Sequence, residues 1–345
     1  YVWIDAFAVR QHPGNIADLD FSFCIQKCEA VLLVTESNNE VTQLEIEDIN
    51  FINRATKGVY ELGSVFKTFT LAAALNEKIV ETNTEFVDLE KSIRCGGNTI
   101  SEYDLKIPSN LTAEEILIRS GNIGSVRIGQ KLGLEKFMEY MNKFDLMNQM
   151  NFDIEEMGVP LKLRWGKCKL ATASFGHGIT TTPIQLAKAY SIVSNGGYEI
   201  HPTLIKKDKT EIKKRILDQE VSFKINNILR KIVTTKEGTA SLANVNGYEV
   251  GGKTGTAQKI INGNYSNKKI NTFASIFPIS NPKFTLVVML DEPKTNKDYI
   301  YTYRDGSGKY KGTPFNTAGW TSVEIVGQII DKIGPILATK YIEVE

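Results

Sequence analysis

The 345-residue chain has few of the residues that build metal centres and disulfide frameworks. It contains 3 histidines and 4 cysteines, and Cys24 and Cys28 have no further ligands at zinc-binding spacing, so we expect no metal site. Four cysteines do not make a disulfide framework in a chain of this length. We therefore expect Cys24, Cys28, Cys95 and Cys168 to be free or partly buried thiols.

The chain also lacks a charge imbalance and any long apolar run. Its formal net charge is +1 and it has no basic stripe with interleaved aromatic residues, so neither nucleic acid nor anionic lipid is an expected partner. No apolar run approaches the roughly 18 to 20 residues that span a bilayer, and no signal-like segment opens the chain. The apolar content of 42% is ample for one large globular domain or two modest ones.

A serine stands three residues before a lysine at Ser64, Ser266 and Ser280, and only the first pair has the surroundings of a site. A glycine precedes Ser64, and an apolar run typical of a helix, residues 66–75, follows it. Positions i and i+3 share one face of a helix, so the Lys67 amine can reach the Ser64 hydroxyl. The other two pairs lie in stretches rich in Asn, Lys or Pro that predict turns.

Two further motifs follow in chain order, Ser120-Gly121-Asn122 and Lys253-Thr254-Gly255. Taken singly, each motif has an ordinary structural explanation: a helix cap at Ser64, a turn at 120–122 and a strand end at 253–255. Together and in this order, they match the set that characterises class A β-lactamases and penicillin-binding proteins. A functional interpretation of the three motifs is therefore favoured.

The similarity extends to the segments around these motifs, which are residues 53–61, 175–179, 182–187, 251–259 and 317–320. With the motifs, they resemble the transpeptidase domain of monofunctional (class B) penicillin-binding proteins. The likeness is greatest to the division-specific peptidoglycan D,D-transpeptidases of the penicillin-binding protein 3 type. It covers about residues 50 to 338.

The motifs indicate a serine nucleophile, Ser64, with Lys67 as its base. A serine hydroxyl needs a base beside it, and a lysine amine can serve only when it is neutral. Burial and the nearby like charge of Lys253 would lower the pKa of Lys67 from its reference value of about 10.4. Ser120 fits a proton relay between the two lysines and the leaving amine.

The resemblance also implies how substrate would be held. The backbone N–H groups of Ser64 and Thr256 would form the oxyanion hole, and Asn122 would orient the substrate peptide bond. Lys253, with the Thr254 and Thr256 hydroxyls, would bind the terminal carboxylate. Room for a peptide along this strand would be left by its glycines, which are Gly251, Gly252 and Gly255. The reaction requires no metal and no organic cofactor.

The pattern of elements predicts an α+β fold, in which an antiparallel sheet is flanked by helices, and the resembled family has this architecture. We expect helices from 112 towards 120 and over 134–144, 183–195, 219–233 and 322–333. We expect strands over 30–35, 249–254, 272–278 and 284–290.

Residues 31–345 are expected to form the transpeptidase domain, and residues 1–30 a remnant or linker to a pedestal and membrane anchor that the chain lacks. Because it begins at Tyr1, we expect it to be a fragment. The resemblance places the catalytic domain on the periplasmic side of a bacterial inner membrane. It implies peptidoglycan stem peptides and β-lactam antibiotics as ligands and membrane proteins of the division machinery as partners.

Two other functions compete with septal cross-linking. A serine β-lactamase, D,D-carboxypeptidase or β-lactam sensor would use the same acylation, but the Glu-x-x-Leu-Asn segment of class A enzymes is not found. Class D enzymes and related sensors usually have Ser-x-Val where this chain has Asn122. A non-catalytic division scaffold is the third possibility, and the intact motifs argue against it.

We expect structural roles for the three histidines and for Trp320. His177 lies between two glycines and could be a general base, but the lysines and serines already supply proton transfer. His12 and His201 adjoin prolines and are expected in loops. Trp320 is expected to pack against the C-terminal helix rather than to bind substrate.

Overall fold

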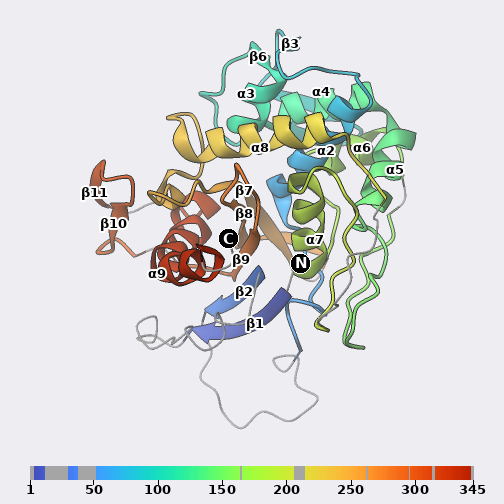
Figure 1. Cartoon of the computed structure of the whole chain (residues 1–345). Coiled ribbons are helices and arrows are strands. Elements are labelled where there is room, and N and C mark those ends of the chain that lie inside the picture. The colour runs from blue at the N-terminus through green and yellow to red at the C-terminus, as the bar shows by residue number, and fades with distance from the viewer. Residues whose placement is uncertain are drawn as a thin grey trace.

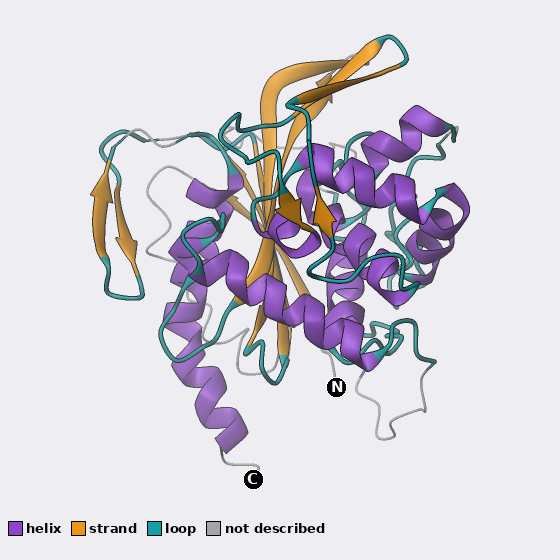
Figure 2. Cartoon of the chain, turned by 90° about the horizontal axis from the view of Figure 1, so that it is seen from above, coloured by secondary structure: helices purple, strands orange, loops and turns teal. Residues whose placement is uncertain are grey.

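A five-stranded sheet forms the centre of the computed structural model. The structure describes residues 4–11, 30–37 and 52–342, except 164, 206–213, 262, 295, 313 and 314. The strand order is β1-β2-β9-β8-β7. The strands are β1 (Ile4–Gln11), β2 (Ala30–Ser37), β7 (Gly251–Ile261), β8 (Asn264–Phe277) and β9 (Phe284–Asp291). Figure 2 shows the strands crossing the middle of the molecule between two groups of helices.

The expected strands are confirmed, and the sheet is extended at one edge by parallel pairs. β7, β8 and β9 are antiparallel neighbours, whereas β2 runs parallel to β9 and β1 parallel to β2. The predicted turn at Ser266 is wrong, because this residue lies within β8, where the β7–β8 ladder continues beyond the buried part of the sheet. Ser280 does lie between strands β8 and β9, as predicted.

Helices cover both faces of this sheet. α7 (Pro183–Ser194) and α9 (Ser322–Ile342) both pack on β8 and β9, and Figure 1 shows them on opposite sides of the strands. All eight residues of β9 are buried, as expected for a strand that is covered on both faces. α8 (Gln219–Thr234) packs on β7 at the edge of the sheet.

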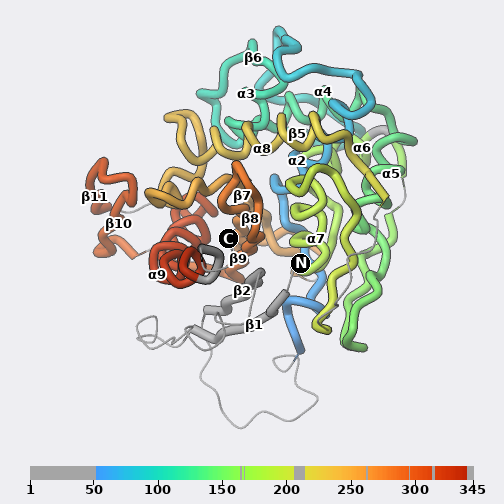
Figure 3. Tube along the Cα trace, viewed as in Figure 1, coloured from blue at the N-terminus to red at the C-terminus, as the bar shows by residue number. Residues whose placement is uncertain are grey.

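A second group of helices surrounds α2 (Lys67–Asn76). Nine of its ten residues are buried, so this helix is enclosed by the protein on nearly all sides. Figure 3 shows it beside elements that are distant in sequence, α4, α5 and α8. The other helices of the group are α3 (Ala113–Ile118), α4 (Asn122–Leu132), α5 (Leu134–Lys143) and α6 (Lys167–Ala173).

Local sequence signals set the ends of several helices. Thr112 and Glu115 form a reciprocal capping box at α3, and Thr182 and Gln185 form another at α7. The predicted helices over 134–144, 183–195 and 219–233 are confirmed within a residue or two. α9 is longer than predicted, because it continues through Pro335 to Ile342.

The prediction of free thiols is wrong for two of the four cysteines. Cys95 and Cys168 form a disulfide with a Cα–Cα distance of 5.4 Å across 73 residues of sequence. It joins β4 (Ser92–Cys95), paired with β5 (Asn98–Ser101), to α6. Tertiary folding brings these two residues together, so their spacing in the sequence carried no signal. Cys24 and Cys28 lie outside the described residues.

Short elements complete the structure. β3 (Glu85–Phe86) pairs with β6 (Leu111–Thr112), and β10 (Ile300–Tyr303) pairs with β11 (Gly308–Lys311). The 3₁₀ turns of the described residues are η3 (Gly63–Phe66), η4 (Ser241–Ala243) and η5 (Ala318–Trp320). Within the described part of the chain, no helix combines the length and apolarity that a membrane span needs.

Candidate active site

Ser64 lies in the turn η3, which leads directly into the buried helix α2. This turn borders a cleft of about 850 Å³. Most of the polar residues predicted for the site line the cleft, namely Ser64, Ser120, Asn122, Thr254 and Thr256. The other two predicted polar residues, Lys67 and Lys253, are 1% and 0% exposed and lie beneath its surface.

Close backbone contacts press the nucleophile turn against strand β7. A Cβ atom on Gly255 would lie 2.1 Å from the Leu62 carbonyl oxygen and 3.3 Å from the Val65 nitrogen, so a side chain at this position would push the turn away. Gly63 in turn packs on the backbone of Thr256. The Lys-Thr-Gly glycine is therefore needed for the approach of Ser64 to Thr256, in addition to leaving room for a peptide.

The Lys67 amine is surrounded by acceptors from the Ser-x-Asn motif. Its Nζ lies 2.5 Å from the Ser120 carbonyl oxygen, 3.2 Å from Ser120 Oγ and 2.7 Å from Asn122 Oδ1. Within the described residues its hydrogen bonds go to these atoms and not to Ser64. In enzymes without substrate, catalytic contacts are often long and tighten on binding.

Ser120 Oγ bridges the two lysines. Lys253 Nζ donates to it at 2.8 Å and also to the Thr254 carbonyl oxygen at 3.0 Å. The backbone of Ser120 has a φ of +58°, a conformation that is uncommon for residues other than glycine and is often found at functional sites. The fold therefore holds one hydroxyl between two amines.

Burial lowers the pKa of both lysines. The pKa of Lys67 falls from 10.5 to about 7 because the amine is removed from water, and the negative charge of Glu102 opposes part of this change. Burial also lowers the pKa of Lys253 well below its ordinary value, and the positive charge of Lys67 lowers it further. A neutral amine is thus available near pH 7.

Sequence analysis did not identify Glu102, which supports the Ser-x-Asn motif from behind. Its carboxylate accepts hydrogen bonds from the backbone nitrogens of Asn122 at 2.7 Å and Ile123 at 2.8 Å. It therefore caps the first turn of α4, where a negative charge is favourable. Its position, 20 residues before Asn122 in a short loop after β5, carries no local sequence signal.

The threonines proposed to bind the substrate carboxylate have further partners. The Thr254 hydroxyl lies 2.7 Å from that of Thr239, and the Thr256 hydroxyl accepts the backbone N–H of Ala318 at 3.0 Å. The Thr256 hydroxyl therefore still has its own proton to donate. Thr239 and Ala318 also line the cleft, and neither was identified from the sequence.

His177 and Trp320 both line the cleft. The His177 ring stacks on Tyr265 with centroids 4.6 Å apart, and its Nδ1 is 3.9 Å from a carboxylate oxygen of Glu61. Burial lowers the pKa of His177, although the charge of Glu61 acts in the opposite direction. Trp320 packs against Tyr301 and Tyr310 of the β10–β11 hairpin, with ring centroids 5.2 and 5.1 Å apart.

Within the described residues, no group of three or more His, Cys, Asp or Glu side chains is arranged to hold a metal ion. His201 lines a separate polar cavity of about 310 Å³ with Lys188 and Asp145.

The sequence of the chain is similar to those of known penicillin-binding proteins. Residues 26–314 match the family model described as penicillin binding protein transpeptidase domain. A protein of Caulobacter vibrioides named probable peptidoglycan D,D-transpeptidase FtsI is 31% identical over 302 residues, which cover 84% of this chain and 48% of that protein. Stage V sporulation protein D of Bacillus subtilis is 35% identical over 262 residues, or 68% of this chain and 38% of that protein.

A solved structure has the same fold. The transpeptidase domain of penicillin-binding protein 3 from Burkholderia pseudomallei aligns with a TM-score of 0.70 and 25% identity, covering 82% of each chain. The chain spans about half the length of the curated relatives that it matches, 48% and 44% of the first two. By its sequence match and its fold, the chain belongs to the penicillin-binding protein transpeptidase domain family.

Proposed function

We propose that the protein is a peptidoglycan D,D-transpeptidase that cross-links stem peptides through an acyl-enzyme on Ser64. The observation that carries this proposal is the hydrogen-bonded series Lys67–Ser120–Lys253, which lies at the cleft that Ser64 borders. It provides a neutral amine, a hydroxyl relay and a second amine without any metal. The family match and the names of the relatives support the same reaction.

In the first half-reaction, Ser64 Oγ attacks the carbonyl carbon of the penultimate D-alanine. Neutral Lys67 takes the hydroxyl proton. As the C–N bond breaks, Ser120 donates its proton to the nitrogen of the terminal D-alanine and is re-protonated by Lys67, which is neutral again. The N–H groups of Ser64 and Thr256 stabilise the oxyanion. Asn122 orients the peptide bond, while Lys253, Thr254 and Thr256 hold the terminal carboxylate.

In the second half-reaction, an amine from a neighbouring stem peptide attacks the ester carbon. The new C–N bond forms as the bond to Ser64 Oγ breaks, and the amine proton returns to Ser64 through Ser120 and Lys67. β-Lactams acylate the same serine, but the amine that leaves the carbonyl carbon stays attached to the acyl group through the opened ring. The edge position of β7 supports a peptide bound as an added strand, with Gly255 beneath it.

We further propose that this activity serves septal wall synthesis, with division proteins in the membrane as partners. The relatives named FtsI support a division role. The Cys95–Cys168 disulfide supports folding in an oxidising compartment such as the periplasm, with attachment to the inner membrane outside residues 31–345. The transpeptidase domain would comprise 31–345, and the boundary at residue 30 stays a prediction.

The test is intact-protein mass after brief exposure to benzylpenicillin, followed for several hours, for the wild type and for Ser64→Ala. We expect a persistent adduct in the wild type and none in Ser64→Ala. A peptide donor ending in D-Ala-D-Ala, supplied with an amine acceptor, should then give a cross-linked product.

Other outcomes would contradict the proposal. A rapidly decaying adduct with turnover of penicillin would indicate a β-lactamase. Hydrolysis of the donor without amine transfer would indicate a carboxypeptidase. If folded wild-type protein forms no adduct at all, a non-catalytic division scaffold becomes the better explanation.

A further inference from the structure

Three segments that do not belong to the Lys67–Ser120–Lys253 series also line the cleft, and we call them its outer wall. Leu242 comes from η4, Tyr303 from the end of β10, and Trp320 from η5. All three line the same cleft as Ser64. The shape of the cleft therefore depends on how these segments are fixed relative to one another.

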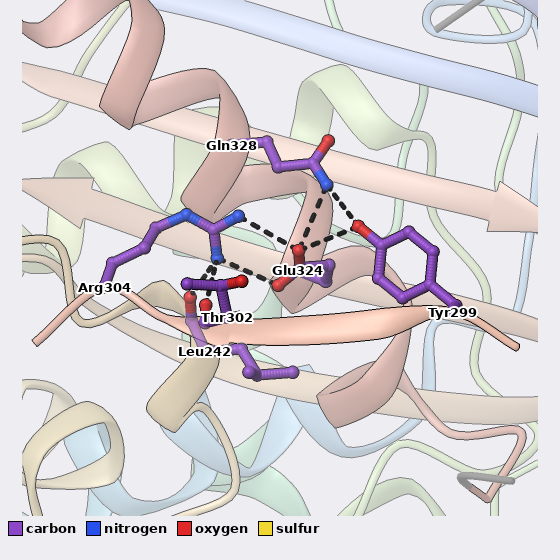
Figure 4. Close-up of polar contacts among 6 residues, drawn as sticks. All are labelled: Leu242, Tyr299, Thr302, Arg304, Glu324 and Gln328. Carbon is purple, nitrogen blue, oxygen red and sulfur yellow. Dashed lines mark hydrogen bonds and ion pairs between the residues drawn. The ribbon is translucent and has the colours of Figure 1, made fainter. Parts of the chain in front are cut away.

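One side chain joins all three segments. Arg304, directly after Tyr303, donates from Nη1 to the Leu242 carbonyl oxygen at 2.9 Å (Figure 4). Its two terminal nitrogens also bind both carboxylate oxygens of Glu324, at 2.9 and 3.0 Å. Glu324 lies in the first turn of α9, four residues after Trp320. A planar guanidinium can make this bidentate contact and the third bond together.

The surroundings of this ion pair are built to hold it. The side chains of Arg304 and Glu324 are only 10% and 6% exposed. Tyr299 Oη and Gln328 Nε2 each donate to Glu324 Oε1 at 3.0 Å, so both carboxylate oxygens are satisfied. A Cβ atom on Gly327 would lie 2.7 Å from Arg304 Nη1, so glycine at that position leaves the space that the guanidinium occupies.

The β10–β11 hairpin needs such an attachment. Among the described residues it forms a sheet of two strands only, and Figure 1 shows it standing away from the central sheet. An isolated two-stranded hairpin is marginally stable in water. Trp320 packs on Tyr301 and Tyr310 of the hairpin. Loss of the ion pair would free the hairpin and with it the aromatic wall of the cleft.

We propose that Arg304 is a positioning residue: by joining Leu242 to Glu324 it fixes the outer wall of the cleft for binding of the peptide substrate. The inference rests on the proposed transpeptidase function. Arg304 contacts neither Ser64 nor the lysines, so its removal should weaken substrate binding without slowing the chemical step. Such a change appears as a higher KM with an unchanged kcat.

The test uses a short peptide thioester as donor, with release of the thiol followed by a thiol reagent. For Arg304→Met we expect KM to rise about tenfold while kcat stays within about twofold of the wild type. Arg304→Lys keeps the charge but cannot bind Glu324 and Leu242 together, so it should give an intermediate KM. Thermal unfolding of each variant shows whether it is folded at the assay temperature.

The matched control is Lys188→Met. Lys188 is also a buried cation in an ion pair, 2.8 Å from Asp145, but it lines the separate polar cavity. We expect it to lower stability and to leave KM unchanged. A folded Arg304→Met with wild-type KM would overturn the proposal, and so would an equal rise in KM for Lys188→Met.

Two further results keep the test decisive. If Arg304→Met does not fold, Arg304→Lys and Glu324→Gln carry the comparison, and wild-type KM in both would reject the positioning role. If the wild type forms no benzylpenicillin adduct, the transpeptidase proposal fails instead. The two failures are therefore distinguishable.

Discussion

Two of the buried polar clusters in the described part of the chain are built in opposite ways, one at the cleft and one at its outer wall. At the cleft proposed as the active site, Lys67 and Lys253 share the Ser120 hydroxyl, and burial lowers the pKa of both. At the outer wall, burial acts to lower the pKa of Arg304, but its bonds to Glu324 raise it overall. Among the described residues the two lysines have no direct carboxylate partner and their pKa values fall, whereas Arg304 is paired with Glu324 and stays charged.

The difference between the two clusters lies in how the cost of burying a positive charge is offset. Burying an ion costs several kcal/mol, and a well-placed partner with additional hydrogen bonds offsets that cost. Glu324 provides such a partner, together with Tyr299 and Gln328. Glu102 lies near Lys67 but directs its oxygens to the backbone of α4. The catalytic cluster therefore retains an uncompensated cost, which is expressed as a lowered lysine pKa.

The largest expected effect comes from removing the catalytic amine. Lys67→Met should slow acylation by benzylpenicillin about 10³-fold, because a positioned general base contributes about 10²- to 10⁴-fold. The measurement is the rate of adduct formation by mass spectrometry. Acylation by folded Lys67→Met at the wild-type rate would show that another group is the base.

Breaking the Arg304–Glu324 ion pair should lower the stability of the fold and leave the chemical step unchanged. Arg304→Met leaves Glu324 buried without its cation, and we expect the free energy of unfolding to fall by about 3–5 kcal/mol. The double variant Arg304→Met/Glu324→Leu removes both charges and should recover a large part of the loss. Denaturant unfolding of the two variants checks this. Equal losses in both would mean that packing, not the unpaired charge, is responsible.

The rate of acylation should depend on pH through the catalytic lysine. If neutral Lys67 is the base, as proposed, its pKa of about 7 means that the rate should rise as pH increases through 7 and then level off. Below pH 6 it should fall about tenfold for each unit of pH. Acylation by Arg304→Lys should keep the same midpoint, since the wall does not touch the base. A pH-independent rate from 5.5 to 9 would contradict the assignment.

The smallest expected effect is a gain in stability on removing the buried lysine. Between about pH 7 and 10.5, the unfolded chain binds the Lys67 proton and the folded chain does not, so wild-type stability rises with pH across this window. Lys67→Met should be more stable than the wild type by about 1–2 kcal/mol at pH 7. The difference should shrink as pH approaches 10.5. Thermal unfolding at pH 7 and pH 10 measures it, and a less stable Lys67→Met would reverse the comparison.

Local chemistry made much of the fold predictable. The capping box at Thr112 and the cap followed by proline at Thr182 predicted where α3 and α7 begin. The strand over 284–290 was predicted to within one residue, whereas β7 and β8 extend well beyond the predicted 249–254 and 272–278 and β1 was not predicted. Local signals failed where tertiary context decided the outcome. Ser266 lies in a strand because β7 and β8 pair far beyond the sheet core, and the β10–β11 hairpin had not been predicted.

The three motifs in the sequence were sufficient to identify the family and to propose Ser64, Lys67 and Lys253 as site residues, because motifs depend on residue type and order. The tertiary structure alone decided which groups meet. It joined Cys95 to Cys168, placed Glu102 behind Asn122, and set Arg304 against Glu324. These contacts join residues 20 to 73 positions apart, and hydrogen bonding and burial at such separations leave no periodic or local pattern in a sequence.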